Sequence, residues 1–445
     1  MDLEIGGRWH HPVNVFHGRD RPAGAPASES SHSGRMSAEL GIARAVSGLI
    51  ATAWLGIAAH QLTVYQFGQV TLVLSLGSLV SIGTDLGIPL ALSKVACDHR
   101  ELDHDAVWRA VSTRVVAGLI AGIVLVALWA NTGETERWWL AGLYSISVIV
   151  TPVGGSFLAL LRGRAIGVVE AAYDVLSKVA LLGVGVATLA AGWRPSGVIV
   201  AFVLVDLVSS LLLPVVSARH LTLSNTPDPL QRAELRLRAT LPLSAAGILG
   251  SAYERIDIWL LALLRGSSSV AIYVAAYKLY DTALLPAAAI ASSAVAAAGP
   301  ALETNARPTA RRLALRATLV AVPIALVVAL AAPRLLRAAF GGHYGTGTAS
   351  GAVAILMVAS LPGAALAAIT PIALLSRRQL IVKWTIAGLV GNIVGNVVLV
   401  PLLGIRGAAV AFLITDTILL LAFYNALPGA RTAATPVTAP VTSSG

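Results

Sequence analysis

Long apolar segments separated by short polar ones fill most of the chain. Each holds about 20 or more residues with few charges, which is the length that a helix needs to cross a bilayer. The pattern predicts twelve such helices, at residues 40–59, 67–92, 108–130, 138–161, 167–192, 195–216, 240–264, 268–298, 312–338, 349–375, 380–403 and 405–426. We therefore expect an all-α polytopic membrane protein of about twelve transmembrane helices.

Three polar stretches divide this apolar chain into parts. Residues 1–38 and 428–445 are rich in Gly, Pro, Ser and Thr and lack apolar runs, so they are expected to be disordered tails. The longest internal polar stretch, residues 217–239, is expected to be a linker between two six-helix lobes at residues 39–216 and 240–427.

Three sequence features recur at one offset of 210 residues. The matching pairs are Val200–Phe202 with Val410–Phe412, Asp206 with Asp416, and Pro152 with Pro362. Because six helices is an even number, both halves begin on the same side of the membrane. The repeat therefore predicts lobes related by a pseudo-two-fold axis along the membrane normal, with a substrate between them.

Composition and charge support the membrane assignment and orient the chain. Hydrophobic residues make up 56% and charged residues 12% of the chain, against about 25% charged in soluble domains, which excludes a water-soluble enzyme. With the N-terminus inside, the inner tails and loops carry about 22 Lys and Arg and the outer loops about six. Both termini and the linker are therefore expected to be cytoplasmic. The net charge of +10 belongs to these inner segments, and no nucleic-acid partner is expected.

Two classes of functional site are missing from the sequence. Cys97 is the only cysteine, which excludes an intramolecular disulfide and a CxxC metal site. No GxxxxGK[ST] phosphate loop is present, so energy from ATP is not expected. We expect no cofactor, no bound metal and no enzymatic activity.

Six short motifs, taken in order, resemble those of a known family. They are Tyr65–Gln69 (YQFGQ), Thr84–Ile88 (TDLGI), Tyr253–Asp257 (YERID), Ile272–Lys278 (IYVAAYK), Phe340–Tyr344 (FGGHY) and Gly404–Ala409 (GIRGAA). Their order and spacing over residues 38–427 resemble the polysaccharide exporters, or Wzx-type flippases, of the multidrug/oligosaccharidyl-lipid/polysaccharide (MOP) exporter superfamily. The resemblance implies a two-lobed, MATE-like fold in the bacterial plasma (inner) membrane. It also implies a flippase that moves a polyprenyl-pyrophosphate-linked oligosaccharide to the outer leaflet by alternating access.

Cations inside the predicted spans are candidates for binding the pyrophosphate. A flippase must pass this anion through a region with little water, and fixed positive charge lowers the free-energy cost. The candidates are Arg44, Lys178, Arg255 and Lys278. Arg255 and Lys278 are expected at similar depth on adjacent helices. The alternative is that they only neutralise nearby acids.

Acids inside or beside the spans are candidates for ion coupling or for a charge network. They are Asp85, Glu170, Asp174, Asp206, Glu254, Asp257, Asp281 and Asp416. Asp206 and Asp416 fall near the middle of their spans, where H⁺ or Na⁺ coupling is expected. The fifth predicted helix carries a charged stripe at i, i+4 and i+8 that ends at Lys178 and should face a cavity or another helix. The alternatives are pairing with a cation, capping of a backbone or, for Asp85, packing of an Asp-Leu-Gly turn.

Two other functions remain open at this point. A multidrug or small-molecule antiporter of the same superfamily would favour an anionic cavity, whereas this chain carries embedded cations as well. An extracytoplasmic polysaccharide ligase or glycosyltransferase would need a sizeable outer loop with acid/base residues, and the outer loops are short. The expected partners are the lipid bilayer, a lipid-linked sugar, and a polysaccharide polymerase or glycosyltransferases. The protein is expected to be a monomer.

Overall fold

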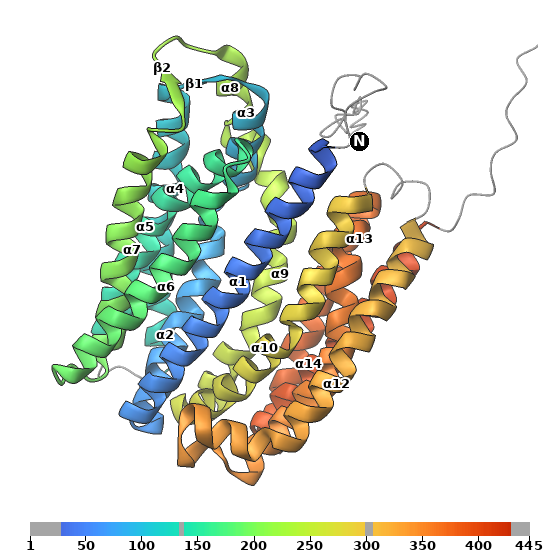
Figure 1. Cartoon of the computed structure of the whole chain (residues 1–445). Helices are drawn as coiled ribbons and strands as arrows, with labels where there is room; N and C mark the ends of the chain where they lie inside the picture. The colour runs from blue at the N-terminus through green and yellow to red at the C-terminus, as the bar shows by residue number, and fades with distance from the viewer. Residues whose placement is uncertain (1–27, 133–137, 299–305, 429–445) are drawn as a thin grey trace, which may run out of the picture.

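The protein is a bundle of long helices that run in alternating directions (Figure 1). This computed structural model describes residues 28–132, 138–298 and 306–428; the side chains of some helical residues within these ranges, Arg44 among them, are not described. The long helices are α1 (Ser28–Gln61), α2 (Val64–Gly83), α4 (His104–Ala130), α5 (Trp138–Gly163), α6 (Gly167–Ala190), α7 (Ser196–Ser217), α9 (Leu237–Arg265), α10 (Ser267–Ala298), α12 (Ala306–Phe340), α13 (Gly347–Leu403) and α14 (Ile405–Ala426).

Helix α13 consists of two membrane-length segments, Gly347–Leu374 and Ser376–Leu403, which join at a kink. Arg377 has non-helical torsions there (φ −148°, ψ 47°). With α13 counted as two, the described residues form twelve long helices, as the apolar pattern predicts. Among the described residues, nine of these helices are long and apolar enough to cross a membrane. The prediction of a helical polytopic membrane protein is confirmed.

Two boundaries differ from the prediction. Helix α1 begins at Ser28, so the last part of the predicted tail, residues 28–38, is helical, while residues 1–27 and 429–445 lie outside the described chain. The predicted span 67–92 is two helices, α2 and α3 (Ile88–Asp98). Leu86 (φ 48°) and Gly87 (φ 72°) adopt left-handed torsions between them, which a right-handed helix cannot contain.

The twelve helices pack in two groups of six. Helices α1, α2 and α4–α7 contact one another, and α9, α10 and α12–α14 form the second group; α2 packs on α9 and α10, and α1 on α10 and α12, to join the groups. Glycines permit the closest approaches. A Cβ at Gly68 of α2 would lie 1.9 Å from the carbonyl oxygen of Ser267, and one at Gly56 of α1 would lie 2.4 Å from that of Ala339.

Four of the six corresponding helix pairs of the two groups start at one offset. Helix α9 begins 209 residues after α1, and α14 begins 209 residues after α7. The two segments of α13 begin 209 residues after α5 and α6, respectively. This spacing is within one residue of the sequence repeat. It supports the prediction that the two halves are parallel copies of one six-helix design.

A small folded cap covers one end of the first helix group. Strand β1 (Glu101–Asp103) pairs in parallel with β2 (Thr222–Ser224), and the short helix α8 (Pro229–Glu234) follows. Asp103, 2% exposed, accepts hydrogen bonds from Nε of Arg232 at 2.7 Å, from the amide of Asp228 at 3.0 Å and from that of Ala106 at 3.1 Å. The bond from Arg232 and these amides hold the pKa of the Asp103 carboxyl well below its ordinary value, although burial acts in the opposite direction. The segment between the two helix groups is therefore fastened to the first group. Figure 1 shows the cap and the start of α1 at the same end of the bundle.

Candidate functional site

A buried carboxylate held by tyrosine hydroxyls lies inside the second helix group. Asp416 of α14 is 3% exposed and accepts a hydrogen bond of 2.7 Å from Oη of Tyr253 on α9. Oη of Tyr280 on α10 lies 3.4 Å from its other oxygen. Thr415 accepts a second bond from Tyr253, at 3.0 Å, and another from the amide of Asn392 at 3.4 Å. Three helices and the second segment of α13 thus meet at one polar cluster.

The close approach of these helices depends on one glycine. A Cβ at Gly363 of α13 would lie 2.6 Å from the hydroxyl of Tyr280 and 3.2 Å from Oδ2 of Asp416. A side chain at this position would therefore separate the tyrosine from the carboxylate. The sequence repeat singles out the neighbouring Pro362 but gives no reason for the glycine.

A second buried carboxylate lies on α9. Asp257 is 0% exposed and accepts hydrogen bonds from Oη of Tyr273 at 2.6 Å and from the amide of Ile258 at 2.8 Å. Within the described part of the chain, neither Asp257 nor Asp416 has a Lys, Arg or His nitrogen within 4.0 Å. Both acids are thus satisfied by hydroxyl and amide donors.

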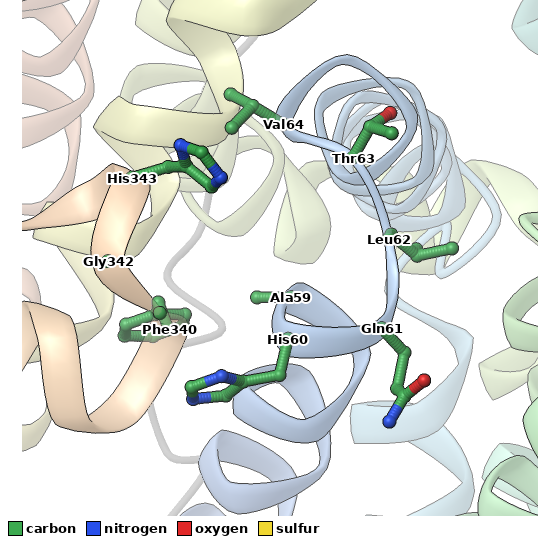
Figure 2. Close-up of a pocket in the computed structure, with 10 residues that line it drawn as sticks. Ala59, His60, Gln61, Leu62, Thr63, Val64, Phe340, Gly342 and His343 are labelled. Atoms are coloured by element: carbon green, nitrogen blue, oxygen red, sulfur yellow. The ribbon is translucent and has the colours of Figure 1, made fainter.

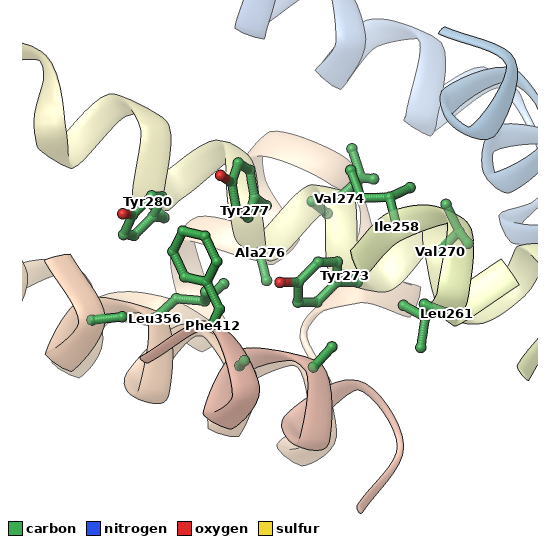
Figure 3. Packing of buried hydrophobic residues seen from close by; sticks show 14 of the residues in the cluster. Ile258, Leu261, Val270, Tyr273, Val274, Ala276, Tyr277, Tyr280, Leu356 and Phe412 are labelled. Carbon is green, nitrogen blue, oxygen red and sulfur yellow. The ribbon is translucent and has the colours of Figure 1, made fainter. Parts of the chain in front are cut away.

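Aromatic rings surround these two acids. Figure 3 shows Tyr273, Tyr277 and Tyr280 following one another along α10, with Phe412 of α14 against them. The ring of Tyr277 lies 5.2 Å from that of Tyr280 and 5.7 Å, edge to face, from that of Phe412. The guanidinium of Arg255 lies 5.9 Å from the centre of the Tyr277 ring. This cation–π contact places the predicted cation against the tyrosine layer.

Four charged side chains gather beside this layer on α9 and α10. Nζ of Lys278 lies 2.7 Å from Asp281 in a half-exposed ion pair. Arg255 is half-buried and interacts electrostatically with Asp281, with the exposed Glu254 and with the buried Asp257. No carboxylate of the described residues lies within 4.0 Å of Arg255. Arg255 therefore makes no direct ion pair with Asp257, which is hydrogen-bonded by Tyr273, and acts on that acid at longer range. We call Glu254, Arg255, Lys278 and Asp281 the α9–α10 charge cluster.

The predicted stripe on α6 divides between two environments. Glu170, 3% exposed, receives two hydrogen bonds from Arg162, at 3.1 and 2.5 Å, and this ion pair closes the turn between α5 and α6. Lys178, farther along α6, interacts electrostatically with Asp206 of α7. Asp174 lies between them and has a partner of its own. The first helix group thus carries a charged interior of its own, away from the α9–α10 charge cluster.

The remaining predicted residue, Asp85, belongs to a structural contact that the sequence analysis missed. Its carboxylate accepts a 2.5 Å bond from Arg114 of α4, which is 4% exposed. Arg114 also donates to the carbonyl oxygens of Thr84 and Pro152 and to the hydroxyl of Ser156. Arg114 lies inside the predicted span 108–130, where the sequence alone gives no reason to single it out. The bonds favour the turn-packing alternative for Asp85.

Two cavities lie outside these charged clusters. One, of about 550 Å³, is lined by the turn between α1 and α2 and by the start of η2 (Gly342–Tyr344), with His60 and His343 on its two sides (Figure 2). The other, of about 580 Å³, lies between α6 and α7 and is almost wholly apolar. Among the described residues, no group of three His, Cys, Asp or Glu side chains could hold a metal ion.

Together, the long apolar helices and the repeat of their starting positions define a helical polytopic membrane protein. The chain belongs to the polysaccharide biosynthesis protein family, whose sequence profile matches residues 38–302. The resemblance of the six motifs is therefore confirmed at the level of the family. No curated protein sequence matches the chain.

Solved structures of MOP transporters share the fold. An inward-facing multidrug resistance MATE family transporter of the MOP superfamily is 16% identical, covers 88% of this chain and 96% of its own, and has a TM-score of 0.58. A MOP superfamily transporter from Pyrococcus furiosus, described as having a binding pocket of reverse polarity, is 17% identical (88% and 94% covered, TM-score 0.56). The eukaryotic MATE transporter AtDTX14 is 11% identical (89% and 94% covered, TM-score 0.55).

Proposed function

We propose that this transporter moves a polyprenyl-pyrophosphate-linked oligosaccharide from the inner to the outer leaflet of a bacterial plasma membrane, by alternating access of its two helix groups. The observation that carries the proposal is Arg255. This cation lies within a membrane-length helix, without a carboxylate in ion-pair contact among the described residues, next to Lys278 on the adjacent helix. Embedded cations of this kind are costly unless they serve an anion. A pyrophosphate is the anion that a member of this family would carry.

The family match supports the proposed substrate, because the family is one of polysaccharide biosynthesis. We propose that both termini and the β1–β2 cap are cytoplasmic, where the lipid-linked sugar is made. A polysaccharide polymerase or glycosyltransferases are the proposed partners. The cation excess of the inner segments supports this orientation.

We propose further that an H⁺ or Na⁺ gradient drives the cycle through Asp416. A buried carboxylate surrounded by neutral donors can bind a proton or a small cation with little change in the surrounding structure. Tyr253, Tyr280 and Thr415 supply the oxygen atoms around it. Asp257, with Tyr273, is a second such group one layer away.

The experiment that tests the function uses the full chain in proteoliposomes with two labelled cargoes. One is a fluorescent lipid-linked oligosaccharide, whose transfer between leaflets is measured by a membrane-impermeant quencher; the other is a cationic dye. The proposal expects transfer of the lipid-linked oligosaccharide above that of protein-free vesicles and no accumulation of the dye. Dye accumulation without oligosaccharide transfer would replace the proposal with a multidrug antiporter, in keeping with the multidrug resistance MATE transporter that shares the fold.

A further inference from the structure

The apolar cavity between α6 and α7 is a groove that runs along two membrane-length helices. Its walls come from the two facing sides of these helices alone, from Val169 to Val184 on α6 and from Leu204 to Val216 on α7. The α6 wall spans 15 residues of rise, or about 22 Å. The cavity volume of about 580 Å³ falls within the range of ligand sites. It is an elongated site rather than a rounded pocket.

The groove lies between the α6–α7 hairpin and the cap end of these two helices. The two helices touch near their hairpin, where the hydroxyl of Thr188 donates 2.9 Å to the carbonyl oxygen of Gly197. The groove extends from there toward the start of α6 and the end of α7, which lie at the cap end of the bundle (Figure 1). Under the proposed orientation, its cap-side end lies in the leaflet in which the substrate is loaded.

The walls of the groove are exposed and apolar. Leu176 is 65% exposed, and Val208 and Leu212 are each 54% exposed, so no described helix covers them. Both helices are membrane-spanning by length and composition. A hydrocarbon chain is the ligand class that such a surface takes within a bilayer.

Three of the side chains that line the groove carry hydroxyl groups, and charged residues lie near them on the same two helices. Tyr173, Ser177 and Ser209 bring hydroxyl groups to an otherwise apolar lining. Tyr173 interacts electrostatically with Asp174 and Asp206. Lys178, which directly follows Ser177, provides a cation at the same height in the membrane.

This combination favours one occupant over an ordinary lipid tail. The acyl chain of a phospholipid leaves its phosphate at the membrane surface and gains nothing from a cation at mid-helix. The isoprenoid chain of a lipid-linked sugar differs, because its phosphate must pass the middle of the bilayer while the chain stays in hydrocarbon. The chain then has to leave the protein sideways, at the height of the travelling phosphate, through a gap between helices.

We infer that the α6–α7 groove binds the isoprenoid chain of the lipid-linked substrate while its phosphate passes Lys178. This inference rests on the proposed function and assigns one further site to it.

The test uses the full chain in nanodiscs with a polyprenyl phosphate that carries a photoreactive group on its isoprenoid chain. Labelled residues are identified by mass spectrometry of the digested protein. The inference expects labels within 169–184 and 204–216, removed by unlabelled polyprenyl phosphate and retained in excess phosphatidylglycerol. Labels elsewhere, or equal competition by the phospholipid, would overturn it.

A matched pair of variants sharpens this test. Leu212 lines the groove, whereas its neighbour Leu211 is similarly exposed, at 61%, and does not. Leu212→Trp is expected to lower groove labelling roughly tenfold, which is about 1.4 kcal/mol of binding free energy, and Leu211→Trp to leave it within about twofold. Equal labelling of the two variants would contradict the site. Ala172→Phe, which fills the groove from the α6 side, repeats the test should Leu212→Trp fail to insert.

The experiments distinguish an error in the assignment of the groove from an error in the proposed function. If the wild-type chain and Leu212→Trp transfer lipid-linked oligosaccharide equally well, the assignment of the groove is wrong and the proposed function is retained. If the wild-type chain neither transfers the oligosaccharide nor gains any label from polyprenyl phosphate, the function itself falls. Lys178→Met should weaken labelling by polyprenyl phosphate while labelling by uncharged polyprenol is retained; equal loss for both probes would remove the role of the cation.

Discussion

The hydroxyl of Tyr253 on α9 donates a 2.7 Å hydrogen bond to Asp416 on α14, across the interior of the second helix group. The two residues are 163 positions apart in the chain, and both are almost fully buried. A buried carboxylate without a cation beside it depends on such donors. The bond therefore links the packing of α9 and α14 to the charge state of the proposed coupling site.

Removal of the Tyr253 hydroxyl should destabilise the protein and disturb coupling. We expect Tyr253→Phe to lower the free energy of unfolding by roughly 1–3 kcal/mol, because Asp416 loses a donor that it cannot replace with water. Thermal unfolding in detergent measures this. The matched control is Tyr344→Phe: this tyrosine is equally buried, but its hydroxyl has no partner among the described residues. Equal losses in the two variants would show that the bond is unimportant.

The Asp416 carboxylate should make transport depend on an ion gradient. We expect Asp416→Asn to insert and fold, because an amide keeps acceptor capacity for Tyr253. Transport by this variant should no longer respond to an imposed H⁺ or Na⁺ gradient, measured in proteoliposomes. A response of normal size would exclude Asp416 as the coupling residue.

Arg114 should be essential for the corner between α2, α4 and α5. It is 4% exposed and satisfies two backbone carbonyls, one hydroxyl and Asp85. We expect Arg114→Ala to cost about 3 kcal/mol or more, seen as a loss of folded protein in the membrane. Arg109→Ala, on the same helix at a side chain 66% exposed, should change stability by less than about 0.5 kcal/mol. A tolerated Arg114→Ala would contradict this structural role.

The cap should lose stability in acid. Asp103 has a folded-state pKa below its unfolded value, chiefly through the hydrogen bond from Arg232, so its contribution is full at neutral pH and declines as the pH falls below about 4. We expect Asp103→Asn to lower the melting temperature at pH 7 and to lower it less at pH 3.5. A deficit that is independent of pH would mean that the carboxylate charge is not what holds the cap.

The orientation of the chain is open to a direct test. The distribution of Lys and Arg predicts that both ends lie in the cytoplasm. A reporter that is active only in the cytoplasm, fused after residue 430, should therefore be active, and the same reporter fused at residue 193 in the α6–α7 turn should not. The reverse pattern would invert the proposed direction of transport.

Helix positions could be predicted from the sequence because lipid imposes one requirement on every span. A run of about 20 apolar residues has few other stable structures in a bilayer. Residues 268–298 and 405–426 accordingly match α10 and α14 to within one residue. The predicted span 67–92 runs through this break because the turn segment Gly83–Gly87 (GTDLG) is short and apolar residues lie on both sides of it; the left-handed torsions of Leu86 and Gly87 separate the two helices.

The candidate site could be predicted only in part. Embedded charges are visible in a sequence, so Arg255, Lys278 and Asp416 were found. Their partners were not, because a tyrosine in an apolar helix is typical of core packing, and only the folded chain brings Tyr253 to Asp416. The spacing of Tyr273, Tyr277 and Tyr280 at i, i+4 and i+7 is the one signal that predicts a shared helix face.

Folding of an Arg255 variant is a precondition for testing the central claim. Because Asp257 receives its hydrogen bonds from Tyr273 and Ile258, removal of Arg255 leaves that acid satisfied. We expect Arg255→Ala to reach a normal level in the membrane, and Arg255→Ala with Asp257→Ala to transport no better than the single variant. Transport near normal in the double variant would mean that Arg255 serves Asp257 and does not bind the pyrophosphate.

The most direct measurement is the rate at which Arg255→Ala transfers a lipid-linked oligosaccharide in proteoliposomes, relative to the wild type and to Arg265→Ala. Arg265 lies at the end of the same helix and bonds to the backbone carbonyl of Pro401. The account predicts a loss of at least roughly tenfold for Arg255→Ala, partial rescue by Arg255→Lys, and little change for Arg265→Ala. A rate for Arg255→Ala equal to that of the wild type would contradict the proposal that this cation binds the travelling pyrophosphate.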